Sequence, residues 1–166
     1  MVQIRYCQFC GNLNQYGYID GNNRYHCLNC SAIHYQNPKP TATLICMKDD
    51  QLLLGKRDRN PAKGKWGLIG GFMELNETLE QAAVRELYEE SKLDGEVINI
   101  FGTASHFNTI FGDVLLIGLE IKINDWSTLE AGDDISEAQL FEINNLPDLA
   151  FDSHLELVNL YKNKRN

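Results

Sequence analysis

Short hydrophobic runs separated by polar turns predict strands along much of the chain. Residues 41–47 and 52–54 are two such runs, and the polar residues 48–51 between them have the composition of a turn. Residues 97–101 and 114–123 show the same pattern further along and predict two later strands. The sequence therefore predicts a sheet assembled from segments spread over the second part of the chain.

Two segments follow the helical period instead. Apolar and small residues recur at helical spacing in the first of them, and we expect these to face the core: Leu79, Ala83, Val84, Leu87 and Ser91. Thr78 and Gln81 have the spacing of a capping box, which predicts that this helix begins just after Thr78. A final helix is expected over residues 153–162, with an apolar side formed by Leu155, Val158 and Leu160.

Composition narrows the class of protein. The chain has 166 residues, of which 43% are hydrophobic and 10% aromatic, so it is long enough for one globular domain and a small additional module, and it is not disordered. It contains no apolar run of membrane-spanning length and begins without the apolar segment of a signal peptide, so we expect a cytoplasmic protein. A net charge of −8 argues against a general nucleic-acid or membrane binder.

The chain divides into two parts near residue 37. Residues 1–36 carry two basic side chains and one acidic, whereas the remainder carries 13 basic and 22 acidic. The two prolines in residues 37–40 favour an extended linker. We therefore predict a small module over residues 1–36, a linker over 37–40 and a larger domain over 41–166.

Four of the five cysteines lie in the small module, in two pairs that each have two residues between the cysteines. This spacing is typical of a structural zinc site with the ligands Cys7, Cys10, Cys27 and Cys30. Residues 18–26 between the pairs have the pattern of a short hairpin. His26 and His34 are spare candidate ligands for this zinc site, but with four thiolates present we expect them not to bind the metal. The alternatives to zinc are two disulfides or a redox site. Cys46 is expected to be a small apolar strand residue.

The first predicted helix carries a cluster of charges beside its apolar side. Glu86, Glu89 and Glu90 are spaced so that their carboxylates project toward one region, with Arg85 next to them and Glu77 near the start of the helix. Hard oxygen donors in such a cluster favour Mg²⁺ or a similar divalent cation. The simpler alternative is a solvated acidic face, the usual role of a run of charges.

The complete pattern resembles the Nudix box of the Nudix hydrolase family. It consists of Gly71, Glu77 six positions later, the segment from Arg85 to Glu90, and Leu93. Lys92 stands where that family usually has glycine, which leaves the charged positions intact but affects how the helix ends. Just upstream, Ile69 replaces a frequent proline. With the cysteine pairs, the sequence is identified as a member of the zinc-ribbon subgroup of this family.

This resemblance implies a fold and a chemistry. The fold would be an α/β (α+β) class Nudix α/β/α sandwich with a mixed sheet, preceded by a zinc ribbon. The activity would be Mg²⁺- or Mn²⁺-dependent hydrolysis of a nucleoside diphosphate derivative, in which water attacks phosphorus. Glu86 and Glu90 would be the main metal ligands, with Glu89, the carbonyl of Gly70 and a later carboxylate such as Glu137 or Glu120 in addition. Arg85 and Glu77 would support these carboxylates.

The resemblance also narrows the substrate. Members of the subgroup hydrolyse ADP-ribose or FAD, whereas related NADH pyrophosphatases carry a motif that residues 104–109 do not match. We therefore favour ADP-ribose or FAD, with AMP as a product. The candidate substrate-binding residues are Tyr35, Arg57, Trp66 and Phe107, together with Lys63, Lys65 and Phe111. The alternatives are that the aromatic residues belong to the core and that the basic ones are simply exposed.

Other functions remain open at this point. One is a non-catalytic Nudix regulator that senses a dinucleotide, and another is a zinc-ribbon enzyme that processes capped RNA ends. We expect a homodimer that binds a small-molecule nucleotide, without a nucleic-acid or membrane partner, and we expect His106 to be a loop residue and not a catalytic base.

Overall fold

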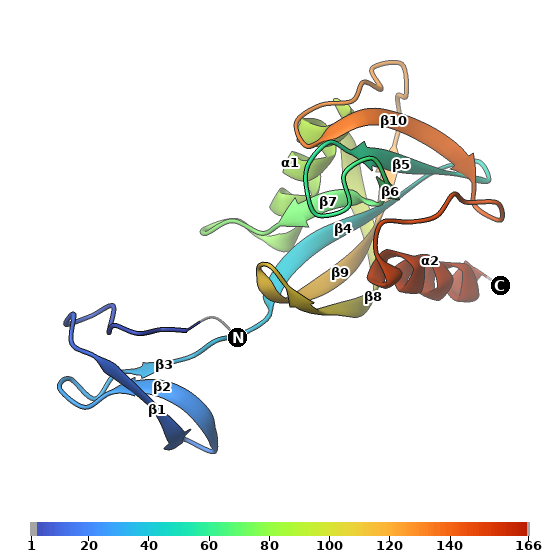
Figure 1. Cartoon of the computed structure of the whole chain (residues 1–166). Helices are drawn as coiled ribbons and strands as arrows, with labels where there is room; N and C mark the ends of the chain where they lie inside the picture. The colour runs from blue at the N-terminus through green and yellow to red at the C-terminus, as the bar shows by residue number, and fades with distance from the viewer. Residues whose placement is uncertain (1–2, 166) are drawn as a thin grey trace.

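The computed structural model describes residues 3–165, so the outermost residues of the two predicted domains (Met1, Val2 and Asn166) lie outside the described range. Within it, the chain forms two parts with separate sheets (Figure 1). The N-terminal sheet contains β1 (Asn14–Ile19), β2 (Asn22–Cys27) and β3 (Ile33–His34), in that order. Asp20 and Gly21 connect β1 to β2 with positive φ angles of 51° and 77°, as tight hairpin turns require. The predicted hairpin is therefore present.

The second part is built on one mixed sheet with the strand order β10-β5-β4-β9-β8. Its strands are β4 (Lys39–Lys48), β5 (Gln51–Arg57), β8 (Gly95–Thr109), β9 (Gly112–Ile123) and β10 (Ile135–Glu142). The short strands β6 (Trp66–Gly67) and β7 (Ile69–Phe72) pair with β5 and β4. β4 and β9 run parallel, whereas the other pairs are antiparallel. The sheet is therefore mixed, as the resemblance to the Nudix family implied.

The strand boundaries differ from those expected in two places. β4 begins at Lys39 inside the predicted linker, because Lys39 and Pro40 already pair with Val114 and Leu115 of β9. β8 extends from Gly95 to Thr109, far beyond the predicted residues 97–101, because its partner β9 is long. β10 was not predicted from the sequence, and most of its side chains are partly or fully exposed.

Both helices form where expected, but their buried faces are rotated from the predicted ones. α1 (Leu79–Ser91) begins after the capping box of Thr78 and Gln81. It buries Ala82 and Glu90 as well as Ala83, Leu87 and Ser91, so the prediction for Val84, which is 38% exposed, was wrong. α2 (Asp152–Arg165) buries Leu157, Val158 and Tyr161. Leu155 is exposed, so its prediction was also wrong, because the tyrosine belongs to the buried face and shifts its centre.

The helices cover opposite faces of the sheet. Along β4, Leu44 and Cys46 belong to the hydrophobic cluster under α1, whereas Ile45 between them belongs to the cluster under α2. β5 alternates in the same way, with Leu53 on the α1 side. Because neighbouring strand residues point to opposite faces, the architecture is the expected α/β/α sandwich. Cys46 is fully buried, as a strand residue of the core should be.

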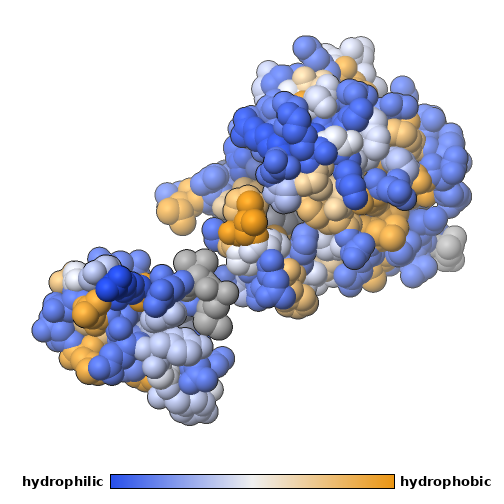
Figure 2. Space-filling view, viewed as in Figure 1, coloured by the Kyte–Doolittle hydropathy of each residue, from blue (hydrophilic) through white to orange (hydrophobic). Residues whose placement is uncertain are grey.

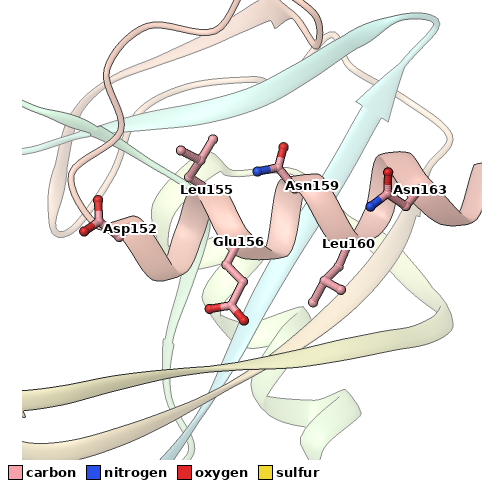
Figure 3. Close-up of a pocket in the computed structure, with 6 residues that line it drawn as sticks. All are labelled: Asp152, Leu155, Glu156, Asn159, Leu160 and Asn163. Carbon is pink, nitrogen blue, oxygen red and sulfur yellow. The ribbon is translucent and has the colours of Figure 1, made fainter.

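The surface combines polar residues with groups of apolar ones on both parts of the chain (Figure 2). We call the N-terminal part, residues 3–36, the ribbon. Its Tyr18 is 78% exposed, and Leu75, in the loop before α1, is 90% exposed. No helix within residues 3–165 is long and apolar enough to cross a membrane. A shallow hollow lies along the outer side of α2, where Leu155 and Asn159 are among its lining residues (Figure 3). None of the predicted site residues lines it.

Candidate active site and zinc site

Two consecutive glycines bring the backbone of β7 close to α1. The φ of Gly70 is 132°, and a Cβ atom there would clash with the carbonyl oxygen of Ala42 on β4. A Cβ atom on Gly71 would lie 2.6 Å from both carboxylate oxygens of Glu86. Only glycine therefore allows the helix to place this carboxylate directly against the strand.

Arg85 holds three carboxylates together. Its Nε and Nη2 atoms donate to the two oxygens of Glu77 at 3.0 and 2.8 Å. Its Nη1 atom donates to Glu86 at 2.7 Å and to Glu89 at 3.0 Å, and Nη2 also donates to the carbonyl of Phe72 at 3.1 Å. These hydrogen bonds from Arg85 lower the pKa of Glu77. The planar guanidinium therefore fixes the orientation of the cluster.

Glu90 completes the cluster from a buried position. Its side chain accepts a hydrogen bond from the backbone N–H of Gly70 at 3.0 Å, and the residue is only 8% exposed. Burial raises the pKa of Glu90 to about 8, and it also raises the pKa of Glu86. One guanidinium does not offset all the carboxylates gathered here, and removing them from water is costly without a further cation.

The donor set fits a divalent metal ion. Glu86, Glu89 and Glu90 offer carboxylate oxygens, which are the ligands that Mg²⁺ and Mn²⁺ prefer. The raised pKa values have burial as their first cause, and a bound cation would favour the charged forms. The structure thus brings Glu77, Arg85 and the three glutamates together beside Gly70, the arrangement expected from the sequence.

Glu137 and Glu120, the candidates for an additional metal ligand, make contacts with residues outside the cluster that Arg85 holds. Glu137 lies on β10, forms an ion pair with Lys56 at 2.7 Å and has a side chain that is 54% exposed. Glu120 accepts a hydrogen bond from the hydroxyl of Tyr161 at 2.7 Å and so lies on the α2 side of the sheet, away from α1. Asp134, which the sequence analysis missed, is close enough for its charge to raise the pKa of Glu90.

The position of Asp134 follows from the loop before β10. The N–H of Gly132 donates to the carbonyl of Glu90 at 3.0 Å, so this loop packs against the end of α1. The only sequence signal was its place in the acidic segment that also contains Glu137. The contact between loop and helix, which brings Asp134 close to Glu90, has no local sequence signature.

The candidate substrate-binding residues are spread over the molecule. Tyr35 donates a hydrogen bond to Asp20 of the ribbon at 2.7 Å, with Arg24 over its ring. Trp66 packs edge-to-face on Phe141 in the core under α2. Phe107 is 64% exposed near the end of β8. Of these four candidates, Arg57 is the one whose charge lowers the pKa of Glu90.

The remaining candidates lie on loops or near the hairpin between β8 and β9. Phe111 packs edge-to-face on Phe72 of β7. Lys63 forms an ion pair with Asp58 at 2.9 Å. His106 is not a loop residue, because it pairs with Val114 within the hairpin, so that prediction was wrong.

The four N-terminal cysteines form one cluster. Their sulfur atoms all lie within 4.8 Å of one another, with 3.6 Å between Cys7 and Cys30 and 3.5 Å between Cys10 and Cys27. A tetrahedral zinc site with four thiolates has S–S separations of about 3.8 Å. All four are free cysteines, so the disulfide alternative does not hold. Hydrogen bonds from Asn12 lower the pKa of Cys10 to about 6, whereas hydrogen bonds with the other cysteines raise the pKa of Cys30 to about 12, and a bound zinc ion would favour the thiolate form of all four.

Known proteins resemble both parts of the chain. An ADP-ribose pyrophosphatase from Methanocaldococcus jannaschii is 39% identical over 140 residues, which cover 80% of this chain and 78% of that protein. The NAD-capped RNA hydrolase NudC of Vibrio atlanticus is 28% identical over 148 residues, and this chain spans 52% of its length.

Solved structures of Nudix proteins also resemble this chain. A NUDIX hydrolase from Nitrosomonas europaea superimposes with a TM-score of 0.83 and 31% identity, covering 98% of this chain and 92% of that one. The NUDIX domain of NrtR from Shewanella oneidensis, solved with ADP ribose, shares the fold at a TM-score of 0.65 and 24% identity, covering 80% of this chain and 91% of that one. The family model described as "NUDIX domain" matches residues 38–161. The chain is therefore a member of the Nudix hydrolase family.

Proposed function

We propose that this protein hydrolyses the diphosphate bond of ADP-ribose and releases AMP. The observation that carries the proposal is the cluster of Glu86, Glu89 and Glu90, which Arg85 and the N–H of Gly70 hold against β7. The 39% identity to an ADP-ribose pyrophosphatase over most of both chains supports the choice of substrate. FAD is the second dinucleotide that we propose to test, because the sequence resembles enzymes for both.

The three glutamates and the carbonyl of Gly70 would hold Mg²⁺ or Mn²⁺. When bound, such an ion neutralises phosphate charge and lowers the pKa of water so that it can attack near neutral pH. The protein's own side chains prepare this site. Arg85 fixes the carboxylates of Glu77, Glu86 and Glu89, and is itself held by Glu77 and by the carbonyl of Phe72, so little reorganisation is needed during the reaction.

Arg57 is the best-placed side chain for the diphosphate itself. It stands at the end of β5 and acts on Glu90, so a phosphate near the glutamates would also be near this guanidinium. Its planar donors match phosphate oxygens well. Asp134 and Glu137 are both proposed as further carboxylates, with Asp134 favoured because of its influence on Glu90. Phe107 and Tyr35 stay candidates for contact with the base.

A panel of dinucleotides tests the proposal directly. ADP-ribose, FAD and NADH are each incubated with the protein and Mg²⁺ or Mn²⁺, and the products are identified. We expect AMP and ribose 5-phosphate from ADP-ribose, and a loss of at least about 100-fold in rate for Glu90→Gln with folding unchanged. Full activity after both Glu86 and Glu90 are changed to Gln would refute the proposal.

NAD-capped RNA is a candidate substrate of a different class from the free dinucleotides. Several NudC proteins match nearly the whole chain, including the ribbon, although the chain spans only about half of their length. The ribbon also carries Arg24 over the exposed ring of Tyr35, a pairing that could stack on a base. Capped RNA therefore belongs in the panel. A steep fall of RNA affinity with salt, together with release of the cap, would favour this substrate over ADP-ribose.

A non-catalytic sensor is less well supported. Such a protein would have lost carboxylates that hold metal, whereas the set here is complete and oriented. Tight binding of ADP-ribose without turnover of any panel member would favour this role.

We further propose that zinc held by the four cysteines is structural and that the protein is a homodimer.

A further inference from the structure

Arg57 differs from the other cations around it. Lys56, Arg59 and Lys63 each form an ion pair with a carboxylate, those of Glu137, Asp134 and Asp58. Arg57 has no such partner within the described residues, and only its Nε atom has a hydrogen bond, to the carbonyl of Pro61 at 2.9 Å. The residue is half-buried. Its two terminal nitrogen atoms are therefore available to an anion. The next residue, Asp58, donates its N–H to the carbonyl of Asp134 at 2.8 Å, in the loop whose Gly132 N–H donates to the carbonyl of Glu90 at 3.0 Å, so this end of β5 lies beside the loop that packs against α1.

One aromatic ring supports this guanidinium. The Arg57 Cζ atom lies 5.1 Å from the centre of the Phe151 ring, within the range of a cation–π interaction. Phe151 directly precedes α2, on a part of the chain remote in sequence from β5. Two histidine rings pack against it: His154 lies at 5.2 Å with an angle of 72°, and His106 lies at 5.1 Å with an angle of 56°. The ring is thus held on several sides.

The segment that carries Phe151 is anchored to the strands that lead into the site. The Nδ1 atom of His154 accepts a hydrogen bond from the N–H of Leu68 at 2.9 Å. The N–H of Ala150 donates to the carbonyl of Trp66 at 2.6 Å. A continuous set of contacts therefore runs from the β6–β7 segment through His154 and Phe151 to Arg57.

We propose that Phe151 is a positioning residue, which holds the Arg57 guanidinium in the orientation that binds the diphosphate of the substrate. This inference rests on the proposed function. The ring restricts rotation of the planar guanidinium, while Pro61 fixes its Nε side, so the terminal nitrogens face in one direction before any ligand arrives. Phe151 acts only through Arg57 and touches no reacting atom.

A double-mutant cycle separates this role from simple packing. Binding of inorganic pyrophosphate, which carries the diphosphate shared by all candidate substrates, is measured by calorimetry in buffer without Mg²⁺ or Mn²⁺. We expect Arg57→Gln to weaken binding at least about tenfold and Phe151→Leu about 3- to 10-fold. In the Arg57→Gln background, Phe151→Leu should have no further effect. Phe151→Tyr, which keeps the ring, should restore binding.

The KM for ADP-ribose should rise most in Arg57→Gln, less in Phe151→Leu and least in Phe151→Tyr. In Phe151→Leu, kcat should change less than KM. Tyr18→Leu removes an exposed aromatic ring from the ribbon and is the matched control, which should bind like the wild type. Equal losses from Phe151→Leu in both backgrounds, or no loss in either, would overturn the inference. A wild-type protein that binds pyrophosphate through Arg57 but does not cleave ADP-ribose would overturn the proposed function, and only the orientation of Arg57 by Phe151 for binding a diphosphate would be retained.

Discussion

Gly71 is the position where a single atom decides the geometry of the acidic cluster. An added Cβ would lie 2.6 Å from the carboxylate oxygens of Glu86, which form the flexible end of a side chain, so the carboxylate would move and the fold would persist. We predict that Gly71→Ala lowers kcat/KM for ADP-ribose by about 10- to 100-fold with little change in melting temperature.

Gly102→Ala is the control for that substitution. A Cβ there would make an ordinary contact of 3.4 Å with Leu160, so activity and stability should both stay near wild type. A Gly71→Ala protein with wild-type kinetics would show that the exact placement of Glu86 does not matter.

His154 should make the stability of the protein depend on pH. Burial, with the charges of Arg57 and His106, lowers the pKa of His154 from 6.5 to about 3. The unfolded chain therefore binds a proton between these values that the folded protein does not. The stability that the neutral ring provides is complete above pH 6.5 and is lost as the pH falls toward 3.

The corresponding prediction compares wild type with His154→Asn, whose amide oxygen can still accept the N–H of Leu68. Urea unfolding should show that wild type loses about 1–2 kcal/mol more than the variant between pH 7.5 and pH 5. Parallel pH profiles for the two proteins would contradict the assignment.

At the scale of elements, α1 ends at a residue whose left-handed backbone conformation destabilises the protein. Lys92 adopts the left-handed conformation at φ 57°, where glycine is normally favoured, and its N–H donates to the carbonyl of Tyr88. The position is the one where the sequence departs from the Nudix pattern. The lysine keeps the geometry that a glycine would have, with its ammonium 5.2 Å from the ring of Tyr88.

We predict that Lys92→Gly stabilises the protein by about 1 kcal/mol, because it removes the left-handed strain. Lys92→Ala loses the same side-chain contacts but keeps the strain, so it should be less stable than Lys92→Gly. Thermal unfolding of the three proteins distinguishes these effects, and a Lys92→Gly protein no more stable than Lys92→Ala would show that the strain is negligible.

The elements differ in how well their sequence predicts them. The Nudix box predicted α1, its capping box and the spacing of its glutamates, because these features depend on residues close in sequence. The rotation of the buried faces at Val84 and Leu155, and the pairing of β10 with β5, depend on what packs against each element. Phe151, Asp134 and Arg57 come from three distant segments, so no local pattern could have grouped them.

At the scale of the whole molecule, the ribbon and the Nudix domain have separate means of stabilisation. The three strands of the ribbon pair only with one another within the described residues, and its main buried apolar positions include Cys7 and Cys27 themselves. So small a module depends on its metal. We predict one zinc ion per chain and, for Cys30→Ser, a ribbon that unfolds while the Nudix domain keeps its own transition.

Hydrogen exchange measures that prediction, since amides of residues 3–34 should lose protection in Cys30→Ser while those of β4 and β9 keep it. Loss of protection throughout the chain would show that the two parts fold as one unit. Sedimentation of the same variant tests whether the proposed dimer requires the ribbon.

The central claim is that the glutamates on α1 support attack of water on a diphosphate. Hydrolysis of ADP-ribose in ¹⁸O-labelled water, with mass analysis of AMP and ribose 5-phosphate, tests it most directly. We predict ¹⁸O in the phosphate of one product, formed only with Mg²⁺ or Mn²⁺ present and slowed at least about 100-fold by Glu90→Gln. Label incorporation that persists unchanged in a Glu86→Gln, Glu90→Gln double variant, or without a divalent ion, would contradict the account.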